Sequence, residues 1–177
     1  MLTEQQWAIG YATVFPAAST VFAGVLHQTQ TIKDCMKFFQ DAKKPAWCPS
    51  DLMDWRMVVT KMAAIGSFTY AAYRVAKFGG GFDNAETKRA LVAYGAWYVG
   101  ATTCGYPVAI RQNWSEICAW NLIVTVGLTG VAALFYKIDK DAGLYSLPFV
   151  VFCYLGMAGM VQAWQLNATD ETKPKTR

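Results

Sequence analysis

The stretch that decides the fold is WAIGYATVFPAASTVFAGVL, residues 7–26. It contains no charged side chain, and about 20 apolar residues in a helix can cross the hydrocarbon core of a bilayer. A helix of a soluble bundle would keep a polar face that recurs about every 3.6 residues, and residues 7–26 show almost none. The stretch therefore favours a membrane helix over a buried helix of a soluble protein.

Four further apolar windows follow along the chain, and the first of these four, residues 52–76, is the poorest because it carries several charges. The five windows are separated by one long connection, residues 27–51, and by shorter ones, and we expect the tail, residues 167–177, to be disordered. We expect an all-α membrane protein with one domain over residues 1–177, a bundle of five transmembrane helices with a long first loop. The expected helices are residues 7–26, 52–76, 90–110, 114–136 and 144–166.

The composition of the chain supports a membrane protein and argues against several other classes. Apolar residues make up 54% and charged residues 16% of the sequence, whereas soluble domains have about 25% charged residues. A net charge of +4 is too weak and too scattered for a nucleic-acid partner. With one histidine and no CxxC pair, we expect no metal site, and we interpret the five cysteines as reduced thiols. No residue pattern points to a catalytic group.

A second informative stretch is AKKPAWCPSD, residues 42–51, in which two prolines flank Trp47. Proline fixes its own φ angle and disfavours helical geometry in the residue before it. The segment is therefore stiff enough to hold Trp47 in one place. Two interpretations stay open at this point: Trp47 covers a pocket, or it anchors the second helix at the membrane interface.

These features resemble the translocator protein family, also called the peripheral benzodiazepine receptor or tryptophan-rich sensory protein family. KPAWCPS, residues 44–50, is similar to the family's Lys-Pro-Ser-Trp-x-Pro-Pro before the second helix. WQLN, residues 164–167, resembles the Trp-x-x-Asn that closes the fifth helix, and the layout of five windows with one long first loop is the family's own. Further matches are Pro16, His27, Gly66 and Pro148.

The resemblance implies a pocket between the five helices, covered by the 27–51 loop, that binds porphyrins, haem or sterol-like ligands. It implies no required cofactor, and it implies the mitochondrial outer membrane if the chain is eukaryotic. Phe152 falls where the family has a ligand-facing aromatic, and Trp55 is a substitute, in a shifted register, for a family tryptophan of the second helix. The candidate ligand-binding residues are His27, Trp47, Trp55, Arg56, Lys61 and Phe152.

Departures from the family pattern bear on the chemistry. Counted from Trp47, Arg56 and Val58 replace a proline and a tryptophan of the second helix, and Gly159-Met160 replaces a Leu-Asn pair of the fifth. Some family members are reported to degrade porphyrins photochemically through tryptophans, so these losses favour a receptor or carrier over an enzyme. A porphyrin-degrading enzyme and a ligand-free scaffold subunit of a membrane complex are the alternatives.

The second window differs from the first and third because it contains cationic side chains, among them Arg56 and Lys61. Lys61 lies about 13 Å into that window, at 1.5 Å per residue, and a charge at such depth costs free energy unless it pairs or reaches the interface. One of the two cations could bind a carboxylate on an amphipathic ligand, such as a porphyrin propionate. The alternative is an internal ion pair, for which Glu116 is the candidate partner.

Small residues recur at four-residue spacing in the third window, where Ala96 is followed by Gly100. In a membrane such pairs let the backbones of two helices approach closely. The sequence thus offers a surface for a homodimer through the third helix, in addition to the lipid bilayer and a hydrophobic small molecule as partners.

Overall fold

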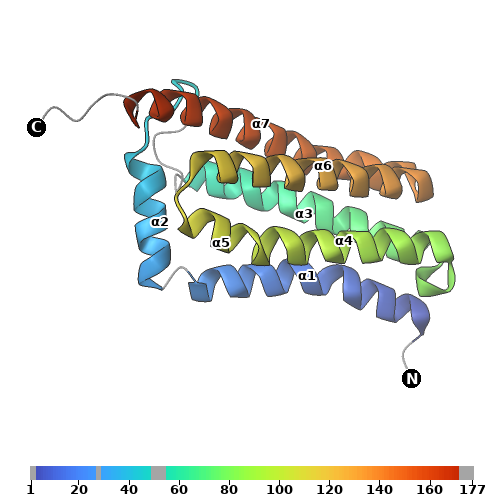
Figure 1. Cartoon of the computed structure of the whole chain (residues 1–177). Coiled ribbons are helices and arrows are strands. Elements are labelled where there is room, and N and C mark those ends of the chain that lie inside the picture. The colour runs from blue at the N-terminus through green and yellow to red at the C-terminus, as the bar shows by residue number, and fades with distance from the viewer. Residues whose placement is uncertain (1–2, 27–28, 49–54, 172–177) are drawn as a thin grey trace, which may run out of the picture.

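The computed structural model of the chain describes residues 3–26, 29–48 and 55–171, and every element in these ranges is helical (Figure 1). The all-α class expected from the sequence is therefore confirmed. The elements are α1 (Glu4–Leu26), α2 (Gln30–Asp41), α3 (Trp55–Phe78), the short 3₁₀ helix η1 (Gly81–Asp83), α4 (Ala85–Thr103), α5 (Gly105–Ile110), α6 (Trp114–Ile138) and α7 (Lys140–Glu171).

Five long helices, α1, α3, α4, α6 and α7, lie side by side, and α2 crosses one end of the bundle (Figure 1). We call this the loop-side end, and the opposite one the far end. Helix α7 packs against α3 and α6, α1 packs against α3 and α4, and α4 also contacts α6. The helices therefore form a closed ring in the order α1, α3, α7, α6, α4.

Two of the described helices are long and apolar enough to cross a membrane, namely α6 and residues 140–168 of α7. Most of the large side chains on their outer faces are exposed, among them Leu122, Ile123, Val126, Val151 and Leu155. Apolar side chains around the outside of a bundle match a hydrocarbon surrounding rather than water.

The connection 27–51, expected as a loop, contains helix α2, so this part of the expectation was wrong. Phe38 and Phe39 pack their rings on Trp114, at centroid distances of 5.0 and 5.8 Å. The thiol of Cys35 donates to Ala109 O at 3.4 Å, and burial raises the pKa of this thiol. Tertiary contacts with α5 and α6 therefore stabilise a helix whose many polar residues hid it in the sequence.

The expected third helix, residues 90–110, is broken at Cys104 into α4 and α5. Pro107 has no N–H to donate to the carbonyl of Thr103, and its ring crowds that carbonyl. Residues 167–171, expected to be part of a disordered tail, belong instead to α7, which continues to Glu171. Within this extension Asn167 Nδ2 donates to Ala163 O at 2.7 Å. Residues 172–177 lie outside the described part of the chain.

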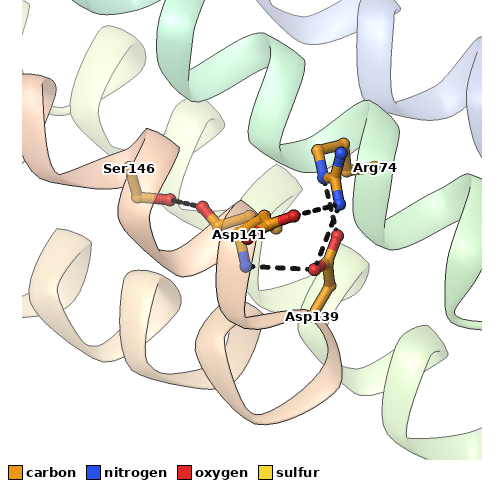
Figure 2. A network of polar contacts seen from close by, with 5 residues as sticks. Arg74, Asp139, Asp141 and Ser146 are labelled. Carbon is orange, nitrogen blue, oxygen red and sulfur yellow. Dashed lines mark hydrogen bonds and ion pairs between the residues drawn. The ribbon is translucent and has the colours of Figure 1, made fainter.

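An ion-pair network at the far end fastens α3 to the turn between α6 and α7 (Figure 2). Arg74 Nε donates to Asp139 Oδ2 at 2.7 Å, and its Nη2 donates to Asp141 Oδ2 at 2.8 Å. Asp139 also accepts from Asp141 N, at 3.0 Å, and it is the single residue between the two helices. The Arg74 guanidinium lies 5.0 Å from the centroid of the Phe78 ring. One arginine thus holds three helices together.

This network predicts acid-sensitive stability. The hydrogen bond from Arg74 lowers the pKa of Asp139, so ionised Asp139 stabilises the fold at neutral pH. That contribution to stability begins to fall below about pH 4, the ordinary pKa of an aspartate in the unfolded chain. It is lost once the pH has passed through the lowered pKa of Asp139 in the folded protein. In detergent, Asp139→Asn should therefore melt below wild type at pH 7, and the gap in Tm should narrow towards pH 3. A gap that is constant over this range would contradict the assignment.

Candidate functional site

The main buried core occupies the far half of the bundle, and a smaller buried group that includes Trp114, Ile117 and Cys118 lies at the loop-side end of α6. Phe68 is fully buried at the centre of the main core, and five aromatic rings surround it at centroid distances of 5.3–6.2 Å. These rings come from α4, α6 and α7, and they close the interior below the middle of the bundle. They belong to Tyr94, Trp97, Tyr98, Phe135 and Phe149.

The loop-side half is packed differently. Among the residues whose side chains the structure describes, none in α1 after Pro16 and none in α3 before Ala64 is buried. In α3 the positions before Ala64 fall on every side of the helix, so the inner face of this segment is accessible as well. The accessible surface of α3 therefore extends from the loop-side end to Ala64, where the buried core begins.

The Trp47 loop, residues 42–48, is fastened to α7 across this end. Trp47 Nε1 donates to Gln162 Oε1 at 2.8 Å, and a methyl group at Gly159 would lie 3.3 Å from the indole. Asn167 exchanges two hydrogen bonds with the backbone of Lys43, at 3.0 and 3.1 Å. Pro45 is buried, and its carbonyl accepts from Cys48 N at 2.9 Å. Four contacts thus keep a 53% exposed indole over the loop-side end.

Lys61 points into the same region. It precedes Ala64 and Phe68 by three and seven residues, so it lies on their face of α3, two turns nearer the loop. Its side chain is exposed, and no ion pair involves it within the described residues. The partner considered from the sequence, Glu116, instead pairs with Arg111 at 3.1 Å. Arg56 is exposed at the start of α3, where its carbonyl accepts from the Thr60 hydroxyl at 2.8 Å.

The structure gives less information about the other predicted site residues. Phe152 is half-buried and packs against the aromatic core from α7. Trp55 is the first residue of α3, and its side chain is not among those described. His27 lies outside the described residues. Of the six predicted residues, the structure brings Trp47, Arg56 and Lys61 to the loop-side end and leaves Phe152 at the edge of the core.

Sequence reasoning missed Gln162. Gln162 holds the Trp47 indole from 115 residues further along the chain, and no local pattern signals such a pairing. The signal that was present is Gly159, which departs from the family's leucine. Because it has no side chain, the indole of Trp47 can approach α7 closely at this position.

An apolar groove of about 600 Å³ runs along the outside of the bundle between α4 and α6. Ala96 and Gly100, the residues predicted for a dimer surface, both line it. Glycines and alanines form much of its floor, and Trp97 and Trp120 form part of its walls. The remaining small residues are Ala93, Ala101, Gly127 and Gly130.

Comparison with known proteins gives the family directly. A search of curated proteins found no match. The sequence profile of the TspO/MBR family, by contrast, matches residues 12–165, which span α1 to α7 and include the Trp47 loop. This agrees with the motifs KPAWCPS and WQLN; Asn167 of the second motif binds the backbone of Lys43, the residue directly before the first. The chain belongs to the TspO/MBR family, a family of membrane proteins with ligand-binding or transport roles.

Proposed function

We propose that the protein is an integral membrane receptor or carrier that binds an amphipathic ligand in the loop-side half of the bundle, under the Trp47 loop. Its five spans are α1, α3, the α4–α5 pair, α6 and α7. The ligand has a large apolar body and a polar or anionic end, as porphyrins, haem and sterol-like molecules do. The observation that carries the proposal is the accessible loop-side surface of α3 at the end of the bundle where Trp47 is docked on α7.

The chemistry of this surface suits such a ligand. Exposed apolar groups on the loop-side part of α3 include Val58, and sites for small molecules are mostly apolar with a few placed polar groups. Lys61 supplies the cation, and an ionisable residue inside a membrane is by default a functional-site hypothesis. An enzyme that degrades porphyrins is disfavoured, because Arg56 and Val58 stand where the family has proline and tryptophan.

The test is a dark titration of the detergent-solubilised chain with protoporphyrin IX, haem and cholesterol. Saturable binding of at least one, with a rise in Tm, is expected, because a ligand of the folded state must stabilise it. Illumination of the porphyrin complex should leave the Soret band intact, whereas protein-dependent bleaching would favour the degrading enzyme. No saturable binding to any of the three would support the scaffold interpretation. The mitochondrial outer membrane stays a prediction from the family resemblance, to be checked by fractionation.

We also propose that a second copy of the chain covers the α4–α6 groove. Gly100 and Gly130 face open space, since a methyl group there would meet no atom within 4 Å. Gly100→Leu should therefore fit within one subunit yet block close approach of the partner helix. We expect it to convert dimer to monomer by light scattering in detergent, while Tm and porphyrin binding stay near wild type. A Gly100→Leu variant that is still dimeric would contradict this surface.

A further inference from the structure

A cavity of about 410 Å³ lies at the loop-side end of the bundle, between α2, the turn from α5 to α6 and the end of α7. Its volume is within the range of small-molecule sites, about 300–1,000 Å³. None of its lining residues belongs to α1 or α3, so it is separate from the surface proposed above for the amphipathic ligand. The residues that matter for its chemistry are Asp34, Lys37, Phe38, Asp41, Trp114 and Asn167.

Helix α2 supplies three charged side chains to this cavity, Asp34, Lys37 and Asp41. Charges three or four residues apart on a helix can pair with one another. Within the described part of the chain, however, Lys37 and Asp41 make no ion pair or hydrogen bond. Asp34 accepts one hydrogen bond, from Gln30 Nε2 at 2.9 Å. The cavity thus contains charges of both signs that the described chain leaves unpaired.

The place of Asp41 makes its charge unfavourable for α2 itself. It is the last residue of the helix, and the last turn contains no basic residue. The helix dipole puts partial negative charge at this end, where a carboxylate destabilises and a cation stabilises. A cationic group bound beside Asp41 would therefore be attracted by the carboxylate and by the end of the helix together.

The other groups around the cavity are already occupied. Trp114 is 8% exposed and packs against the Phe38 ring at 5.0 Å, so the indole leaves no open face for a quaternary ammonium. Asn167 uses its amide on Lys43 and Ala163. The carboxylates of α2 remain as acceptors, and they favour a cation that carries N–H groups.

The cavity also lies at the level where lipid headgroups are expected. Helix α2 crosses the end of the bundle (Figure 1), and Trp114 is the first residue of α6. Helix α6 and residues 140–168 of α7 are long and apolar enough to span a membrane. Further towards the far end these two helices expose apolar side chains, among them Leu122 and Leu155. Acyl chains that lie along them would place a headgroup near the cavity.

We propose that this cavity binds the headgroup of a phospholipid that carries a phosphate and a primary ammonium. Lys37 binds the phosphate, and Asp41 and Asp34 accept hydrogen bonds from the ammonium. Lys37 and Asp41 are four residues apart, which puts their Cβ atoms about 5–6 Å from one another. This spacing suits a phosphate and an amine that are joined by two carbon atoms.

The test measures lipid binding to the full chain in detergent by native mass spectrometry, with phosphatidylethanolamine, phosphatidylcholine and phosphatidylglycerol. Wild type should bind phosphatidylethanolamine about tenfold more tightly than the other two, because only this lipid offers N–H donors and a phosphate together. Asp41→Asn and Lys37→Met should each remove this preference. Their lipid-free Tm should stay at or above that of wild type, because neither side chain has an ion pair in the described chain.

Lys33→Met is the matched control. Lys33 is exposed on the same helix and is not among the residues that line the cavity, so this variant should keep the preference. Soluble O-phosphoethanolamine should not raise the Tm, since it lacks the acyl chains; a rise that Asp41→Asn abolishes would replace the lipid by a soluble compound with the same headgroup chemistry. Equal affinity of wild type for the three lipids, or an unchanged preference in both cavity variants, would overturn the site and leave the proposed function untouched.

Discussion

Phe68→Ala should lower the free energy of unfolding by about 3 kcal/mol, the largest effect on stability that we expect from one substitution. Phe68 is fully buried and contacts rings from α4, α6 and α7. Lipid offers little hydrophobic driving force between helices, so their association depends on such packing. Removing the ring leaves a cavity where three helices meet α3.

The measurement is thermal unfolding of the two proteins in the same detergent. Met62→Ala is the control, because Met62 lies on the same helix and is exposed; its Tm should stay close to that of wild type. A Phe68→Ala variant as stable as Met62→Ala would show that the aromatic cluster does not hold the bundle together.

Lys61→Met should weaken binding of protoporphyrin IX at least tenfold, because a lost charge-assisted hydrogen bond reduces the binding free energy by about 1.5 kcal/mol. Methionine keeps the length and the apolar stem of lysine, so packing along α3 changes little. Lys61 has no ion-pair partner in the described part of the chain, and its removal should leave the ligand-free Tm unchanged or higher.

Lys77→Met is the charge-matched control for this experiment. Lys77 lies at the far end of α3, with its ammonium group 5.6 Å from the Tyr73 ring and 5.3 Å from the Phe78 ring. Its loss removes the same charge from the same helix without touching the loop-side end. Equal affinity of wild type and Lys61→Met for the porphyrin would remove Lys61 from the site.

Much of the fold was predictable because each apolar window carries its own evidence. Residues 114–136 contain so little charge that the helix α6 follows from composition alone. The break at Cys104 has a cause within the sequence, Pro107, which the smooth apolarity of residues 90–110 concealed. Helix α2 could not be predicted in this way, because Phe38 and Phe39 stabilise it by packing on Trp114, a contact between distant segments.

The candidate site, like the fold, could be predicted only where a single segment carries the evidence. Pro45 and Pro49 in the sequence predict a stiff segment around Trp47. The depth of Lys61 in its apolar window predicts that this charge has a partner or a function. The partner of Trp47, Gln162, and the pairing of Glu116 with Arg111 depend on which helices become neighbours.

The central claim is that the ligand binds at the loop-side end, between α1 and α3 and beneath the Trp47 loop. Hydrogen–deuterium exchange of the detergent-solubilised chain, with and without protoporphyrin IX, tests this place directly. We predict that the ligand slows exchange in residues 17–26, 42–48 and 55–63. Protection confined to the α4–α6 groove, residues 93–101 and 123–134, would contradict the claim.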